Sequence, residues 1–165
     1  MVYNAPMEKM HIQEVAQLPD VVAFVHQLLA TKDRQKAVVV GLHGDLGAGK
    51  TTFMKAFAAS LGVTEEVTSP TFVIMKGYEI VESAGGAKRA HPFSHLYHID
   101  AYRIEDVDEM RVLGFEELLQ QKDTIICIEW AENIAPLLPL DTLHITFTIV
   151  GEERDVTFAY HGEKN

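Results

Sequence analysis

Residues 37–62 read AVVVGLHGDLGAGKTTFMKAFAASLG, and this stretch decides the fold. Its first part, 37–42, is a β-branched run without polar alternation, as expected for a strand that is covered on both faces in a largely parallel sheet. Its last part, 51–61, places Phe53, Phe57 and Leu61 at helical spacing before Gly62, a residue suited to end a helix. The stretch therefore predicts a central strand, a glycine-rich turn and a helix in direct succession.

The turn matches a phosphate-binding loop, because residues 44–51, GDLGAGKT, fit the pattern G-x-x-x-x-G-K-[ST]. Glycines let successive backbone N–H groups point into one concavity, and the helix that follows adds its positive end. An ordinary glycine turn is the alternative, which the flanking strand and helix disfavour. The pattern also predicts that Lys50 reaches the β- and γ-phosphates and that Thr51 places its hydroxyl on Mg²⁺. The predicted nucleotide-binding residues of the loop are Asp45, Leu46, Gly47, Ala48, Gly49, Lys50, Thr51 and Thr52.

The remaining pattern predicts one α/β domain over residues 1–165. Helices are expected at 20–30, after Asp20 as a cap, and at 105–121 with a break at Gly114. Strands are expected at 72–80 and 96–102, separated by a polar loop at 82–89, and at 124–128. Alternating residues around the turn 151–153 predict a C-terminal antiparallel hairpin that closes the sheet. The fold class is therefore P-loop NTPase-like, with a mixed, mainly parallel central sheet flanked by helices.

Composition excludes several classes of function. Lys and Arg number 14 and Asp and Glu number 24, so the formal charge is −10, which opposes a broad binding surface for nucleic acid. Cys127 is the one cysteine, which rules out an internal disulfide and a cysteine-ligated zinc finger, and its apolar run predicts a buried, inert thiol. No apolar run approaches the roughly 18 residues of a membrane span, and no secretion signal is recognised. We expect a cytoplasmic protein that contacts no membrane.

A nucleotide site also needs carboxylates at the ends of strands that neighbour the loop, to hold a hydrated metal and orient water. Asp100 and Glu129 fit this position, although each by itself could be a solvated carboxylate at a strand end. Trp130, the one tryptophan, should border the γ-phosphate pocket, with a core aromatic as the alternative. His95 and His98 lie close in sequence but on opposite faces of a strand, which disfavours a shared zinc ion.

Four motifs in order resemble those of the bacterial TsaE (YjeE) ATPases. They are GDLGAGKTTF at 44–53, VTSPTF at 67–72, HIDAYR at 98–103 and IEW at 128–130. LGFEEL at 113–118 and Arg154 also fit, and the resemblance runs from about residue 12 to about residue 160. The chain departs from the family at the start of the first long helix. Where the family usually carries a threonine near the adenine, this chain reads QLPD at 17–20.

The resemblance implies a small ATPase, with ATP and Mg²⁺ as cofactors, that acts with TsaB and TsaD homologues. Their product would be N6-threonylcarbamoyladenosine at position 37 of tRNAs that read ANN codons, with the tRNA contacted only indirectly through the complex. By the same resemblance, Thr51, Asp100 and Glu129 hold the metal, partly through water. The implied catalytic residues are Lys50, Asp100 and Glu129, and Trp130 belongs to the phosphate pocket. The segment 68–71 implies a switch that senses the γ-phosphate, with three candidate hydroxyls: Thr68, Ser69 and Thr71.

Two other functions fit the sequence less well. A P-loop kinase for a small molecule or nucleoside would concentrate arginines in a lid, whereas the five arginines, at 34, 89, 103, 111 and 154, are scattered. A GTPase would carry an Asn-Lys-x-Asp tetrapeptide, which does not occur, so ATP is favoured. The chain also offers no evident arginine finger, so we expect slow hydrolysis without partner proteins, with Arg103 acting in cis as the alternative.

Overall fold

The computed structural model describes residues 8–30, 35–70, 72–81 and 91–160. Thr71 and the loop predicted at 82–89 lie outside these ranges. Within them, seven strands form one sheet in the order β1-β7-β6-β2-β5-β4-β3. The strands are β1 (Glu8–Ile12), β2 (Val38–His43), β3 (Met75–Glu79), β4 (His95–Asp100), β5 (Thr124–Glu129), β6 (Leu143–Val150) and β7 (Glu153–Tyr160). The helices are α1 (Leu18–Ala30), α2 (Lys50–Leu61), α3 (Asp108–Val112) and α4 (Phe115–Leu118), with 3-10 segments η1 (Val15–Gln17) and η2 (Ala131–Leu137).

The centre of the sheet is parallel and its two edges are antiparallel. Strand β2 pairs in parallel with β5 and β6, and β5 pairs in parallel with β4. The β6–β7 hairpin is antiparallel, as predicted, and β3 pairs with β4 in the same way. The expectation that this hairpin closes the sheet is wrong, because β1 pairs antiparallel with the outer side of β7. Sequence analysis missed β1, a short strand of mostly polar residues.

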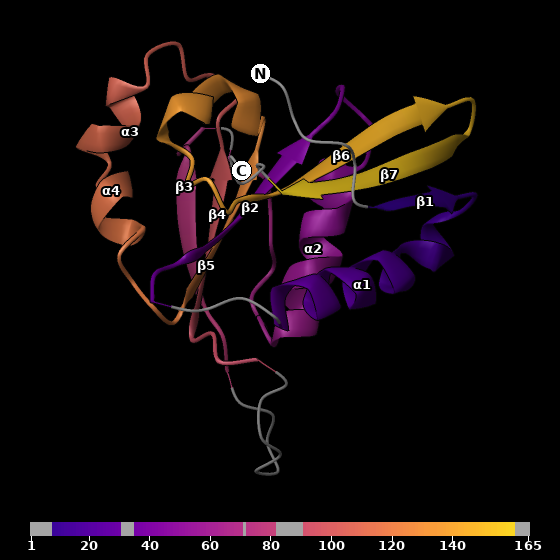
Figure 1. Ribbon diagram of the computed structural model, residues 1–165, viewed down its shortest axis with the longest axis horizontal. Helices are drawn as coiled ribbons and strands as arrows, with labels where there is room; N and C mark the ends of the chain where they lie inside the picture. Colours follow the sequence, from indigo (N-terminus) through magenta and orange to yellow (C-terminus); the bar gives the residue numbers. More distant parts are fainter. Residues whose placement is uncertain (1–7, 31–34, 71, 82–90, 161–165) are drawn as a thin grey trace, which may run out of the picture.

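Helices cover both faces of the sheet, with α1 and α2 on one side and α3 and α4 on the other (Figure 1). Val38 and Val40 contribute to the hydrophobic cluster that contains the residues of α1 and α2. Val39, between them, contributes to the cluster that contains Met110 of α3 and Phe115 of α4. This two-sided burial explains the unbroken apolar run of β2. Among the described helices, none is long and apolar enough to cross a membrane.

Several predicted boundaries differ from those observed. The helix predicted at 105–121 is broken at Gly114, as predicted, where φ is 76°, but its two parts span only Asp108–Val112 and Phe115–Leu118. It starts late because the Glu109 side chain accepts hydrogen bonds from the amides of residues 105 and 106. The strand predicted at 72–80 starts at Met75, since the Pro70 carbonyl accepts hydrogen bonds from the amides of Val73 and Ile74 in a turn. Strand β4 ends at Asp100, two residues early, and α1 begins at Leu18, so Asp20 lies in its first turn.

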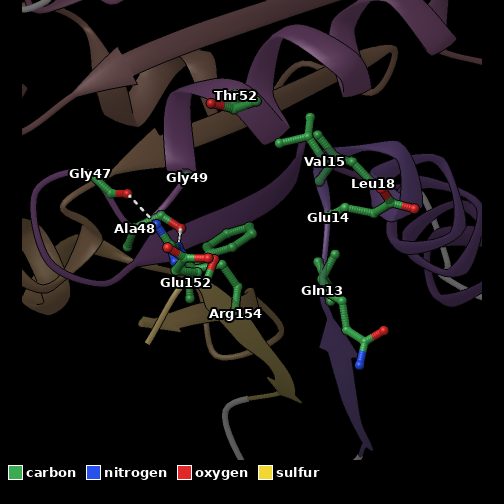
Figure 2. Close-up of a pocket in the computed structure, with 12 residues that line it drawn as sticks. Gln13, Glu14, Val15, Leu18, Gly47, Ala48, Gly49, Thr52, Glu152 and Arg154 are labelled. Carbon is green, nitrogen blue, oxygen red and sulfur yellow. Dashed lines mark hydrogen bonds between the residues drawn. The ribbon is translucent and has the colours of Figure 1, made fainter. Parts of the chain in front are cut away.

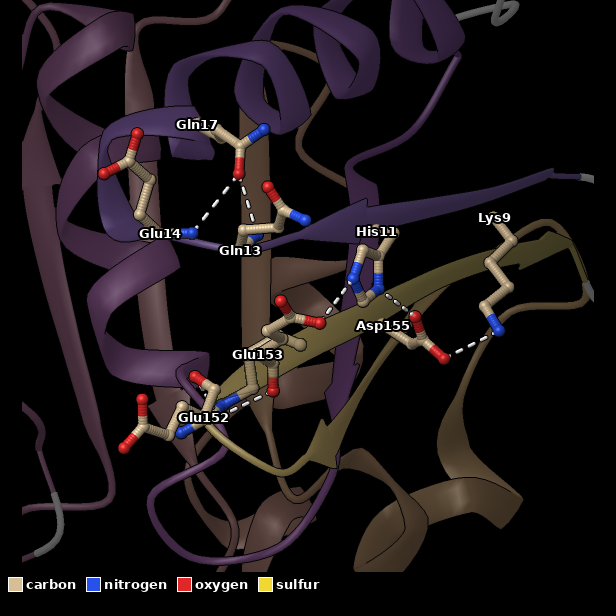
Figure 3. Close-up of polar contacts among 9 residues, drawn as sticks. Lys9, His11, Gln13, Glu14, Gln17, Glu152, Glu153 and Asp155 are labelled. Atoms are coloured by element: carbon tan, nitrogen blue, oxygen red, sulfur yellow. Dashed lines mark hydrogen bonds and ion pairs between the residues drawn. The ribbon is translucent and has the colours of Figure 1, made fainter.

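An ionic network fastens β1 to β7 (Figure 3). His11 Nδ1 lies 2.8 Å from Asp155 Oδ1, and its Nε2 lies 2.7 Å from Glu153 Oε2. Lys9 Nζ lies 2.6 Å from the other oxygen of Asp155. The hydrogen bonds with Asp155 and then Glu153 raise the pKa of His11, because they favour the protonated imidazolium.

The raised pKa makes the stability of this edge depend on pH. A histidine whose pKa is raised by folding contributes stability below its ordinary value of about 6.5 and loses it as pH rises through the folded value. We therefore expect His11→Gln to lower the thermal unfolding midpoint most at about pH 6 and least at about pH 9. Calorimetry of both proteins across this range checks it, and a difference that is constant with pH would contradict it.

Candidate nucleotide-binding site

The loop between β2 and α2 takes a conformation that its glycines allow. Gly44, Gly47 and Gly49 have φ values of 128°, 79° and 113°. At Gly44 a Cβ atom would lie 2.3 Å from the Phe147 carbonyl oxygen, so a larger residue does not fit there. Gly47 and Gly49 alternate with Ala48, whose φ is negative, and such alternation turns successive N–H groups toward one side. Helix α2 begins at once at Lys50, so its free amides face the same region.

Lys50 is buried and rests on the loop that precedes it. Its Nζ donates hydrogen bonds to the carbonyl oxygens of Gly44 and Asp45, the latter at 2.9 Å. The same Nζ lies 4.0 Å from the ring centroid of Trp130, a cation–π contact. Burial lowers the pKa of Lys50, and the charge of Glu129 opposes this effect. The ammonium group is therefore held beside the loop by uncharged partners, two carbonyl oxygens and the ring of Trp130.

Glu129 is the buried carboxylate at the end of β5. Thr51 Oγ1 donates to it and lies 2.9 Å from both carboxylate oxygens. His98 Nε2 lies 2.9 Å from Glu129 Oε1, and His98 is fully buried. Sequence analysis considered His98 only as a zinc ligand and missed this contact. The signal was its spacing, since His98 precedes Asp100 by two residues and so shares its face of β4.

Asp100 lies beside Glu129, because the parallel register of β4 and β5 places these two residues opposite each other. Ser69 Oγ donates to Asp100 Oδ2 at 2.8 Å, and the Tyr102 amide donates to Oδ1 at 3.1 Å. Of the three candidate switch hydroxyls, Ser69 is thus brought to the site. Thr68 and Ser69 are both exposed, but Ser69 alone of the two makes this contact with Asp100, and Thr71 lies outside the described residues.

These side chains line one hollow of about 410 Å³. Its wall consists of Leu46, Gly47, Gly49, Lys50, Thr51, Thr52, Ser69, Asp100, Tyr102, Glu129 and Trp130. We call it the phosphate hollow. Of the predicted site residues that the structure describes, all except Asp45, Ala48 and Thr68 belong to this wall. Asp45 acts through its carbonyl on Lys50, and Ala48 is 1% exposed.

A second hollow of about 240 Å³ shares Gly47, Gly49 and Thr52 with the first (Figure 2). Its other lining residues are Ile12, Gln13, Glu14, Val15, Leu18, Ala48, Phe147, Glu152 and Arg154. We call it the outer hollow. Leu18, one residue of the stretch 17–20 where the chain departs from the TsaE pattern, belongs to its lining. There Gln17 Oε1 accepts hydrogen bonds from the amides of Gln13 and Glu14, at 2.7 and 3.2 Å, and thereby shapes the turn that forms one wall.

Trp130 holds an unusual backbone conformation at the edge of the phosphate hollow. Its φ and ψ are 57° and 43°, a left-handed geometry that bulky residues rarely adopt. Its amide donates to Leu42 O at 3.1 Å and its carbonyl accepts from the Asn133 amide at 3.0 Å, so both sides of the residue are fixed. Such strain is found at functional sites, where the surrounding structure imposes it. The centroid of the Trp130 ring also lies 5.1 Å from the centroid of the Tyr102 ring.

A further carboxylate, Glu132, was not predicted. His43 Nδ1 lies 2.7 Å from Glu132 Oε2, and His43 Nε2 lies 2.8 Å from His144 Nδ1. Burial opposes ionisation of Glu132, but the hydrogen bond with His43 and the charge of Lys50 lower its pKa overall. Nothing in the sequence pattern singles out this group, because its three members come from β2, η2 and β6.

Comparison with known proteins finds a matching family model, similar sequences and a similar solved structure. The family model described as "Threonylcarbamoyl adenosine biosynthesis protein TsaE" matches residues 14–156. A "tRNA threonylcarbamoyladenosine biosynthesis protein TsaE" from Bacillus subtilis is 41% identical over 127 residues, covering 76% of this chain and 72% of that protein. Its namesake from Treponema pallidum is 35% identical, covering 76% and 84%. The crystal structure of Bacillus subtilis YdiB superposes with a TM-score of 0.67 at 31% identity, covering 94% of this chain and 86% of that one.

The contact between Lys50 and Trp130 provides an optical readout. If Lys50 moves from the ring to the phosphates of a nucleotide, the fluorescence of the one tryptophan changes. We expect a change on addition of ATP with magnesium and a smaller one with ADP, measured by titration. Lys50→Ala is the control, because it removes the cation and should abolish the response. No response of the wild-type protein to either nucleotide would place Trp130 away from the ligand.

Proposed function

The chain belongs to the TsaE family, and we propose that it binds ATP with Mg²⁺ and hydrolyses the nucleotide during synthesis of threonylcarbamoyladenosine in tRNA. Its relatives carry the name of that pathway. The observation that carries the proposal is the phosphate hollow. It brings the loop glycines, Lys50 and Thr51 together with two carboxylates at the ends of adjacent parallel strands.

The triphosphate would occupy the phosphate hollow. Loop amides and the positive end of α2, a helix of 12 residues, favour an anion there. Lys50 would exchange two neutral carbonyl partners for phosphate oxygens, and an ion pair with phosphate is the stronger interaction. The base would occupy the outer hollow, since the three shared residues lie between the two. Leu18 and Phe147 supply apolar walls for it.

The oxygen atoms around Glu129 suit a magnesium ion. Mg²⁺ prefers oxygen ligands, usually takes one or two carboxylates and keeps several waters. The Thr51 hydroxyl already lies 2.9 Å from both oxygens of Glu129, and Asp100 is opposite it in register, so donors of the required type converge. We propose that Thr51, Asp100 and Glu129 hold the ion, partly through water. When bound, Mg²⁺ would neutralise charge on the phosphate oxygens.

Hydrolysis requires a positioned water and neutralisation of charge on the γ-phosphoryl group. We assign the first task to Glu129, which His98 holds in place, and we assign sensing of the γ-phosphate to Ser69 through Asp100. For the second task, no arginine belongs to the described wall of the phosphate hollow. Arg103 instead packs its guanidinium 4.8 Å from the ring centroid of Phe72. We therefore propose that TsaB and TsaD homologues complete the site in the assembled complex.

Substitution of Lys50 tests the site directly. Lys50→Ala should abolish measurable binding of ATP with magnesium, because it removes the cation that compensates phosphate charge. Isothermal titration calorimetry measures the affinity, and circular dichroism shows that the variant is folded. Unchanged affinity in a folded variant would remove the assignment of the phosphate loop.

The partner requirement is tested by steady-state phosphate release with and without a TsaB–TsaD complex. We expect the wild-type chain to be slow by itself and to be stimulated by roughly 10³–10⁵, the range for a donor supplied in trans. Glu129→Gln should keep nucleotide binding and lower the stimulated rate by roughly 10²–10⁴, as expected on loss of a group that orients water. Arg103→Ala should leave the stimulated rate near that of wild type.

Two results would contradict these assignments. An isolated wild-type protein that turns over as fast as the complex would show that no partner group is needed. Normal hydrolysis by Glu129→Gln would transfer the water-orienting role to Asp100.

A further inference from the structure

The carbonyl oxygens of the phosphate loop are held by two cations. Lys50 contacts those of Gly44 and Asp45 at the start of the loop. Arg154, the second residue of β7, contacts two carbonyls farther along the loop. Its Nε donates to Ala48 O at 3.2 Å and its Nη2 donates to Gly47 O at 3.3 Å (Figure 2). The two halves of the loop thus contact different side chains. Lys50 belongs to the loop itself, and Arg154 lies more than a hundred residues away in sequence.

Arg154 is itself held firmly. Its Nη1 donates to the carbonyl oxygens of the two residues directly before it, Glu153 at 2.8 Å and Glu152 at 3.2 Å. Strand β7 is paired on both sides, with β6 and with β1. The side chain of Glu153 also contacts His11 of β1 (Figure 3). The guanidinium group therefore presents its planar set of N–H donors from a strand that is hydrogen-bonded on both sides.

This arrangement matters because of how a phosphate nest is built. Peptide units that direct N–H groups toward an anion direct their carbonyls away from it, and those carbonyls need donors of their own. When phosphate binds, Lys50 would turn donors from Gly44 and Asp45 to the ligand. Arg154 can stay on Gly47 and Ala48, so the second half of the loop would keep its shape while the first half shares its cation with the phosphate.

We propose that Arg154 is a positioning residue that holds the 47–49 segment of the loop in the conformation that binds phosphate. The inference rests on the proposed nucleotide site and adds to it a residue from the far end of the chain. Because Arg154 also lines the outer hollow, direct contact with the base or ribose is the competing explanation. The two explanations differ in which part of the nucleotide loses affinity when Arg154 is replaced.

Inorganic tripolyphosphate with magnesium isolates the phosphate contribution, and adenosine isolates that of the base and ribose. We expect Arg154→Ala to weaken both ATP and tripolyphosphate by about 10- to 100-fold in calorimetry, the range for charge-assisted hydrogen bonds, and to leave adenosine unchanged. Arg154→Lys should recover only part of the loss, because one ammonium group cannot reproduce the fork. Asp155→Asn is the matched control. It loosens the same strand at the contact with Lys9 and His11 and should retain the wild-type affinities.

Hydrogen exchange of the nucleotide-free protein gives a second readout. The Ala48 amide donates to Asp45 O at 3.1 Å within the loop, and its exchange should become faster in Arg154→Ala but not in Asp155→Asn. Unchanged tripolyphosphate affinity in Arg154→Ala and Arg154→Lys, or an equal loss in Asp155→Asn, would overturn the proposal. If wild type binds neither ATP nor tripolyphosphate, the proposed function fails, and the exchange of Ala48 still decides whether Arg154 shapes the loop.

Discussion

The carboxylate of Glu129 is the group around which the site is arranged. It is 3% exposed, and a buried charge is costly unless it is hydrogen-bonded and paired. Its partners come from two other elements, Thr51 from α2 and His98 from β4, and the charge of Lys50 lies nearby. Satisfying this one carboxylate therefore fixes the start of α2 and the end of β4 relative to β5. The phosphate loop, which leads directly into α2, is positioned as a consequence.

The same contacts describe a site that is assembled before its ligand arrives. Thr51 occupies Glu129, and Lys50 occupies the loop carbonyls and the face of Trp130. In the function proposed above, each of these contacts would be exchanged for one to a metal ion or a phosphate. The contacts that a ligand need not disturb, His98 with Glu129 and Arg154 with the loop, come from β4 and β7. In that function, β4 and β7 hold the site in place, and Thr51 and Lys50 would exchange their partners when the ligand binds.

Sequence analysis predicted the parts of the fold that local chemistry dictates. The β2–loop–α2 unit, the two carboxylates at strand ends and the C-terminal hairpin all follow from apolar periodicity and motif spacing. It missed β1 because a strand of five residues with only two apolar side chains, Met10 and Ile12, is too short a run to stand out as a pattern. It placed the break at Gly114 correctly but overestimated the length of the helix at 105–121, because the amides of residues 105 and 106 bond to the side chain of Glu109 and do not join the helix.

Long-range contacts account for the rest of what was missed. Arg154 reaches Ala48 across 106 positions, and His43, Glu132 and His144 meet from three separate elements. Such contacts depend on strand order, and the hydrophobic pattern of one chain does not specify the order of a mixed sheet. His98 is an intermediate case, since its spacing from Asp100 gave its face but not its partner.

A crystal structure with Mg²⁺ and a non-hydrolysable ATP analogue tests the central claim most directly. The account predicts triphosphate in the phosphate hollow, with the Thr51–Glu129 hydrogen bond replaced by contacts to the metal ion and its waters. It also predicts that Lys50 Nζ moves from the carbonyls of Gly44 and Asp45 to phosphate oxygens, while the His98–Glu129 contact persists. A nucleotide bound elsewhere, with the contacts of Thr51 and Lys50 as they are now, would contradict it.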